Sequence, residues 1–271
     1  MNRVLIPAVS ADGDVGGTAR ARGDGAAVLA HRGCGSRFTG RSGIADPAAR
    51  TRVPWPQATD FPCYRTIVAL DIEKSTTCTN PVKAALRQKV YELFESALTS
   101  MGIGKRHRDP FVDRGDGVLA LIHPVPAAPK ALVLSGAIPA LNQLLTDYNL
   151  SDAVARQAQC LLRIRVVVHA GEVHYDANGC FGEDLDIAFR LLDAKQVKMA
   201  LQRTTAPSAL VISDEIFLSV VRHGYGGIDK DTFRPIPRVN MADQRHRGWI
   251  QLPEISMQQE PHRVINHRQL A

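Results

Sequence analysis

Two aspartates, Asp71 and Asp116, stand where carboxylates could bind metal ions. Asp71 lies near the end of the β-branched, mostly apolar run 64–72, which is typical of a buried strand. Asp116 lies between Gly115 and Gly117, in a turn flanked by two short apolar runs. If the strand end and the turn share one edge of a sheet, the two carboxylates repel each other unless a cation lies between them. The pattern therefore predicts a divalent-cation site.

The elements that must position these aspartates follow from periodicity and from helix and turn signals. The sequence predicts a strand over 64–72, a helix from an N-cap at Asn80 to Gly102, a hairpin with strands 111–112 and 118–122, a helix over 130–148 kinked at Pro139, and a strand over 162–168 that ends at 169–171. The class is α/β (α+β), with a ferredoxin-like βαββαβ core and additional C-terminal strands and a helix. In this topology the first two strands are parallel, and the third lies antiparallel between them.

Domain boundaries follow from composition. Residues 1–60 are rich in Gly, Ala, Arg, Asp, Ser and Thr without sustained periodicity, so we expect a disordered segment there. A single domain is expected over 61–254, followed by a flexible polar tail over 255–271.

Composition narrows the functional classes. The 271 residues are 45% hydrophobic and carry a formal charge of +6, but Lys and Arg are scattered, so we expect no nucleic-acid partner. Five cysteines without CxxC spacing indicate reduced thiols and a cytoplasmic location. Apolar stretches are too short to span a membrane, and we expect neither membrane association nor a signal peptide.

Four segments, in order, resemble the catalytic domain of class III adenylate and guanylate cyclases, over roughly residues 64–254. The segment 71–76 resembles the family's Asp-Ile-x-Gly-Phe-Thr metal motif, and 115–117 resembles its second metal motif. The stretch 163–173 resembles its next strand, and 182–191 resembles its Gly-x-x-x-Asn-x-Ala-x-Arg-Leu helix. In detail the motifs are similar to divergent cyclase-like proteins of actinobacterial type. Each motif alone is weak, whereas the ordered set is specific.

The resemblance implies a lyase reaction in signalling, in which the ribose 3′-oxygen attacks the α-phosphorus and a 3′,5′-cyclic nucleotide and pyrophosphate form. It implies two Mg²⁺ or Mn²⁺ ions held by Asp71, Asp116 and the carbonyl of Ile72. Arg190 would stabilise charge on the α-phosphoryl group of a nucleoside triphosphate bound by the partner subunit of a head-to-tail homodimer. Phosphate contacts would come from the loop that contains Lys74, Ser75 and Thr76.

The chain departs from the family pattern at several of these positions. Asp186 stands where an Asn usually orients the ribose, and Lys74 replaces a Gly whose backbone approaches the phosphates. The two base-recognition positions fall on Val112 and Gly179, whose side chains cannot read a purine, so a pyrimidine substrate stays open. Candidates for a late phosphate-binding cation are Arg238, Arg245 and Arg247.

Other interpretations compete with an active cyclase. Asp71 could cap the loop after its strand, Asp116 could be a plain hairpin residue, and Asp186 could pair with Arg190 at i, i+4. A degenerate cyclase-homology domain would bind a nucleotide or a protein without turnover. A diguanylate-cyclase or polymerase-like palm ranks last, because the Gly-Gly-Asp/Glu-Glu-Phe turn is absent. His169 and His174 do not form an HExxH motif and are expected to be surface or core residues.

Overall fold

The structure is a computed structural model that describes residues 61–151, 161–241 and 244–252. The predicted disordered segment 1–60 and tail 255–271 lie outside the described residues. Strands and helices alternate along the chain as follows: β1 (Cys63–Ile72), α1 (Asn80–Ser100), β2 (Val112–Asp113), β3 (Gly117–Ile122), α2 (Lys130–Leu132), a π-helical turn η3 (Val133–Ala137), α3 (Ile138–Leu150), β4 (Ile164–Asp176), β5 (Gly179–Phe181), α5 (Glu183–Leu192), α6 (Lys195–Gln202), β6 (Ser208–Ser213), α7 (Asp214–Ser219), β7 (Arg234–Met241) and β8 (Gln244–Gln251).

The sheet has the strand order β2-β3-β1-β4-β6-β8-β7, with β5 paired to β4. Strand β1 is antiparallel to both of its neighbours, β3 and β4, while β4 and β6 run parallel. The elements from β1 to β4 therefore form the predicted ferredoxin-like βαββαβ core, in which α2, η3 and α3 make up the second helical segment and β3 lies antiparallel between β1 and β2. The additional C-terminal strands extend the same sheet.

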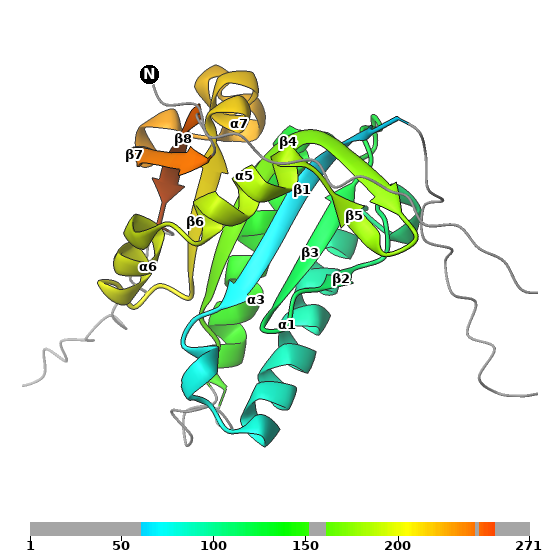
Figure 1. Ribbon diagram of the computed structural model, residues 1–271. Helices are drawn as coiled ribbons and strands as arrows, with labels where there is room; N and C mark the ends of the chain where they lie inside the picture. Colours follow the sequence, from blue (N-terminus) through cyan, green and yellow to red (C-terminus); the bar gives the residue numbers. More distant parts are fainter. Residues whose placement is uncertain (1–60, 152–160, 242–243, 253–271) are drawn as a thin grey trace, which may run out of the picture. The chain divides into compact units, whose positions relative to one another are not determined.

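Helices cover the sheet on both faces (Figure 1). Helices α1 and α3 pack on one face, over a core that includes Val68, Leu70 and Ile72 of β1. Helices α5 and α6 pack on the other face, over Ile67 and Ala69. Because side chains alternate along a strand, Asp71 lies on the same face as Ile67 and Ala69, toward α5 and α6.

Two helix predictions need correction in detail. The cap of α1 is Thr79 rather than Asn80, which is already helical, and the cap makes no side-chain hydrogen bond. The second helix is distorted as predicted, but the irregularity is a π-helical turn over Val133–Ala137 that precedes Pro139. Proline lacks the amide hydrogen that a regular helix needs at this point, so the ladder rearranges one turn earlier.

The predicted end of the fourth strand at 169–171 is wrong. Strand β4 continues to Asp176, because it keeps pairing with β1 as far as Val173, opposite Cys63, and then turns back into β5. Among the described helices, none has the length and apolar character needed to cross a membrane.

Candidate active site

The structure brings Asp71 and Asp116 to the same edge of the sheet. Asp71 is the partner of Gly117 across the β1–β3 ladder, and the amide of Ile72 donates a 3.1 Å hydrogen bond to the carbonyl of Asp116. Both aspartates line one pocket of about 190 Å³ on the α5 side, together with Arg114 and Asp193. The hairpin turn that supplies Asp116 uses Gly115 at φ 78°, a left-handed conformation that favours glycine.

Asp71 already has a cationic partner. The Arg165 guanidinium, directly across the β1–β4 ladder, donates from Nη2 to Asp71 Oδ2. Arg165 also lies 3.7 Å from Asp193, and its side chain is only 12% exposed. Burial lowers the pKa of this guanidinium, and Asp193 opposes that shift. Asp71 therefore forms a cross-strand ion pair, which depends on the β1–β4 register, instead of capping the loop after its strand.

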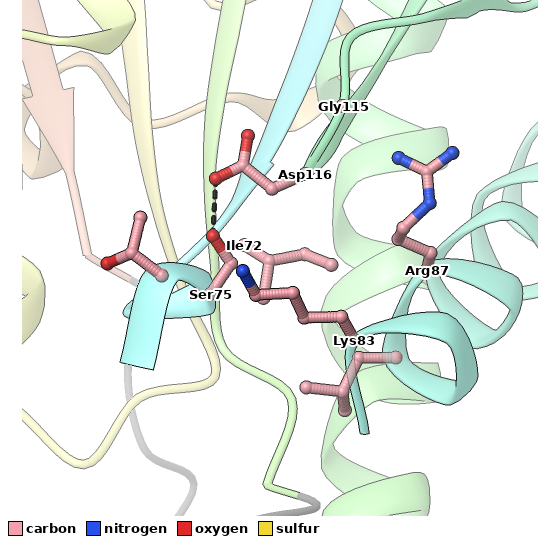
Figure 2. A pocket seen from close by; sticks show the side chains of 8 residues that line it. Ile72, Ser75, Lys83, Arg87, Gly115 and Asp116 are labelled. Carbon is pink, nitrogen blue, oxygen red and sulfur yellow. Dashed lines mark hydrogen bonds between the residues drawn. The ribbon is translucent and has the colours of Figure 1, made fainter. Parts of the chain in front are cut away.

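Asp116 faces a second pocket, of about 270 Å³, on the α1 side (Figure 2). Ser75 is buried there and donates a hydrogen bond from Oγ to Asp116 Oδ2. Thr76 lines the same pocket, and the amino end of Lys83 is turned toward Ser75. Two of the three predicted phosphate-loop residues thus share a pocket with Asp116.

Lys83 and Arg87 of α1 add positive charge to this pocket, and sequence reasoning missed both. Their i, i+4 spacing on the helix that follows the Ser75 loop was the available signal. Arg87 pairs with Asp113 of the hairpin at 3.2 and 2.5 Å. This hydrogen bond lowers the pKa of Asp113 and raises that of Arg87.

Lys74 points elsewhere. It lines a small pocket of about 100 Å³ with Glu73, Arg165 and Lys198 rather than the pocket of Ser75 and Thr76. Its backbone has φ 56° and ψ 23°, and it is the only non-glycine residue at positive φ in the described part of the chain. Glycine adopts this left-handed conformation more readily than lysine does.

Helix α5 carries Asp186 and Arg190, both exposed. No ion pair joins these two side chains within the described ranges, so the competing i, i+4 pair is not formed. Asp186 lines a pocket of about 590 Å³ on the α5 side, whereas Arg190 lines none of the pockets described above. The Arg114 guanidinium lies 4.1 Å from the ring centre of Phe189, and this cation–π contact attaches the hairpin that carries Asp116 to α5.

The two predicted base-recognition residues lie beside this larger pocket and not in its lining. Val112 is half-buried in β2 and packs on the core under α5. Gly179 begins β5, with its amide bonded to Asp176 Oδ1 at 3.0 Å. Besides Asp186, the lining comes partly from the predicted motif segment 182–191 and partly from residues outside it: Gly182, Glu183, Leu185 and Phe189 from the motif, and Arg114, Leu119, Cys180 and Phe181 from outside.

The histidines that the sequence left as core or surface residues are structural. His169 is 4% exposed, and its ring bonds Ser213 Oγ at 2.7 Å and Asp184 Oδ1 at 3.0 Å. Asp184 also accepts a 2.6 Å hydrogen bond from the amide of Glu172, which holds the start of α5 against β4. Burial acts to raise the pKa of Asp184, but the hydrogen bonds from His169 and Glu172 bring it below its ordinary value.

The donor set at the sheet edge suits hard divalent cations. Asp71, Asp116 and the Ile72 carbonyl offer oxygen ligands, which Mg²⁺ and Mn²⁺ prefer. One carboxylate oxygen of each aspartate is engaged, by Arg165 and by Ser75. Among the described residues, no group of three or more His, Cys, Asp or Glu side chains is arranged to hold a metal. A metal ion bound here would have two carboxylates and backbone oxygen as its protein ligands.

Known proteins were compared with the chain by sequence and by structure. No family model and no curated protein matches the chain. One similar solved structure is a guanylyl cyclase, with 15% identity and a TM-score of 0.48; the match covers 72% of this chain and 96% of that one. An adenylyl cyclase from P. aeruginosa has 13% identity and a TM-score of 0.48, with 71% of this chain and 95% of that one covered. An adenylate/guanylate cyclase/hydrolase from Silicibacter pomeroyi has 16% identity and a TM-score of 0.47, with 71% of this chain and 98% of that one covered. All three are named as nucleotidyl cyclases. Because these TM-scores lie below 0.5, we base the function on the chain's own residues.

Proposed function

We propose that the chain is a cytoplasmic nucleotidyl cyclase, which converts a nucleoside triphosphate to a 3′,5′-cyclic nucleotide and pyrophosphate. The observation that carries this proposal is the convergence of Asp71 and Asp116 at one sheet edge, between a pocket on each side. A phosphate chain with its metal ions needs such paired carboxylates, and side chains that donate to phosphate oxygens beside them.

In this proposal Asp71, Asp116 and the Ile72 carbonyl hold Mg²⁺ or Mn²⁺. When bound, two such ions neutralise triphosphate charge and lower the pKa of the attacking 3′-hydroxyl. Ser75 holds the Asp116 carboxylate in place by its hydrogen bond. Thr76 and Lys83 line the same pocket and would donate to phosphate oxygens.

The remaining groups require a second copy of the chain. Arg190 is exposed and makes no ion pair within the described residues, and it lines neither pocket that contains Asp116. We therefore assign Arg190 and Asp186 to the site of a partner subunit in a head-to-tail homodimer. There Arg190 would stabilise charge on the α-phosphoryl group. Lys74 is left without a phosphate role in this proposal.

A second candidate function is a nucleotide-binding or protein-binding module without turnover. The Asp71–Arg165 ion pair favours it, because a guanidinium occupies an oxygen that a metal needs. Asp186 favours it as well, since a carboxylate near a triphosphate repels it.

The test is to incubate the purified protein and Mn²⁺ with ATP, GTP, CTP and UTP separately, and to follow pyrophosphate and cyclic nucleotide. Asp71→Asn and Asp116→Asn should each abolish product. Asp147→Asn is the matched control, because Asp147 lies on α3 and bonds only Gln143 in the described structure. Mn²⁺-dependent nucleotide binding without product would establish the second candidate, and equal activity in the two site variants would reject the site.

A further inference from the structure

We propose that Arg165 is a resident counter-cation of Asp71, which competes with a divalent metal ion for the same carboxylate, so that Arg165 sets the metal affinity of the site. This inference rests on the proposed function, because it concerns the same carboxylate. It differs in that it assigns a role in metal entry to a residue on β4, outside the metal motifs.

The position of Arg165 is fixed by the sheet. Asp71 and Arg165 are direct cross-strand partners on the face toward α5 and α6, and the guanidinium lies between Asp71 and Asp193. Asp116 lines the same pocket as these two aspartates. Arg114 also lines this pocket and Lys198 pairs with Asp193, so three cations share the charge of the three carboxylates, and Arg165 is the one bonded to Asp71.

Arg163 provides an internal standard for how firmly an arginine can be held beside this strand. It lies two residues before Arg165, immediately ahead of β4, and is 15% exposed, against 12% for Arg165. Arg163 pairs with Glu73 at 3.1 Å and donates to the carbonyls of Leu201, Thr204 and Ala206. Backbone carbonyls and one carboxylate thus hold Arg163 on several sides.

Arg165 is held far less completely. Its Nη2 donates to Asp71, whereas its buried Nε and Nη1 atoms make no hydrogen bond. A buried donor without an acceptor has an uncompensated desolvation cost. The guanidinium therefore gives up little interaction energy when it rotates away from Asp71. A pocket of about 100 Å³ next to Arg165, lined by Glu73, Lys74 and Lys198, provides space for that rotation. Asp193, which also pairs with Lys198, lies 3.7 Å from Nη1 and is a second carboxylate for the guanidinium.

Competition for Asp71 has a thermodynamic consequence. The guanidinium uses one oxygen of Asp71, and a divalent ion at the same carboxylate meets its like charge, so the Arg165 ion pair opposes a metal ion that enters without nucleotide. A nucleoside triphosphate brings negative charge that attracts both the metal and the released guanidinium. Metal and nucleotide should therefore bind cooperatively, and the coupling should run through Arg165.

The experiment measures Mn²⁺ binding to the full-length protein by electron paramagnetic resonance, without nucleotide. Arg165→Met should bind Mn²⁺ at least tenfold more tightly than the wild type, and Mn²⁺ should raise its melting temperature by more. Arg163→Met, the matched control, should bind within about twofold of the wild type, since Asp71 keeps its partner. Arg165→Lys keeps the charge and should resemble the wild type. Arg165→Gln keeps a polar side chain and should behave like Met, which covers the case in which Met does not fold.

Unchanged or weaker Mn²⁺ binding in both Arg165→Met and Arg165→Gln overturns the counter-cation role. Loss of the gain in an Asp71→Asn, Arg165→Gln double variant supports it, because the gain must act through Asp71. If Mn²⁺ binds none of the proteins, with or without nucleotide, the proposed function fails together with this inference. If the wild type binds Mn²⁺ and the Arg165 variants bind no more tightly, the inference alone fails.

Discussion

Two aspartates near opposite ends of β1 show how differently one fold treats a carboxylate. Asp109 is 3% exposed and accepts hydrogen bonds from Arg65 at 3.1 Å, His123 at 2.9 Å and Tyr175 at 2.6 Å. Asp71 is 18% exposed, and one donor, Arg165, is bonded to it. A carboxylate whose lone pairs are filled stabilises the structure, whereas one with spare lone pairs can bind a ligand.

The largest expected difference is in stability. Asp109→Asn should lower the free energy of unfolding by about 3 kcal/mol or more, because it leaves the buried Arg65 charge without its partner. Asp71→Asn should cost less than about 1 kcal/mol, since Arg165 keeps Asp193 nearby and repulsion among the carboxylates falls. Urea denaturation at pH 7 measures both variants. Equal losses would remove the distinction between a structural and a ligand-binding aspartate.

Tyr175 tests the Asp109 network at alkaline pH. Burial, and then the hydrogen bond to Asp109, raise the pKa of the Tyr175 phenol. In the unfolded chain this phenol ionises at about pH 10, whereas in the folded protein it stays protonated, so stability falls as pH rises above about 10. Tyr175→Phe should cost about 2 kcal/mol at pH 7, because a bond to a charged acceptor is lost. It should also flatten the alkaline decline in unfolding free energy, and a decline that persists unchanged contradicts the assignment.

Asp184 is intermediate between Asp71 and Asp109, because it accepts hydrogen bonds from two donors. Asp184→Asn should lower the free energy of unfolding by about 1 kcal/mol. Its pKa is lowered in the folded state, so its contribution is complete above the unfolded pKa of about 3.9 and is lost as pH falls through the folded value. Unfolding free energies of the wild type and Asp184→Asn should therefore converge below about pH 4. A constant gap down to pH 2 would show that the charge of Asp184 is not what stabilises the fold.

The smallest effect concerns the loop after Asp71. Lys74→Gly should raise the free energy of unfolding by about 0.5 kcal/mol, since relief of left-handed strain exceeds the entropy that glycine adds to the unfolded chain. Thr76→Gly is the control. Thr76 lies in the short helical turn Ser75–Thr77, where glycine should lower the free energy of unfolding instead. Thermal denaturation of both variants checks the opposite signs. A loss in Lys74→Gly would mean that the Lys74 side chain makes stabilising contacts.

Much of the fold could be predicted because it is encoded locally. The β-branched run of β1, the periodic apolar face of α1 and the glycine-rich hairpin at Asp116 each carry their own signal. The topology that joins them then places Asp71 beside the hairpin. The length of β4 could not be predicted in this way, because its second half depends on pairing with β1 rather than on its own alternation.

The candidate site was predictable where it lies in motifs and not where it depends on register. Asp71, Asp116 and Ser75 come from segments with recognisable spacing. Arg165 meets Asp71 only through the β1–β4 ladder, and Lys83 reaches the Ser75 pocket only through the packing of α1. The arginine contact has no local sequence signal, and the only signal for the lysine was its i, i+4 spacing from Arg87, so neither residue was predicted to belong to the site.

Gly117 limits how this site can vary. It lies opposite Asp71, and a Cβ atom at this position would overlap the carbonyl oxygen of Leu70. Even alanine would push the hairpin away from the central strand and carry Asp116 with it. The spacing of the two acidic residues is thus tied to the absence of a single methyl group. If the proposed site binds metal, its preference can change more readily through the side chains around the pair than through the backbone that spaces it.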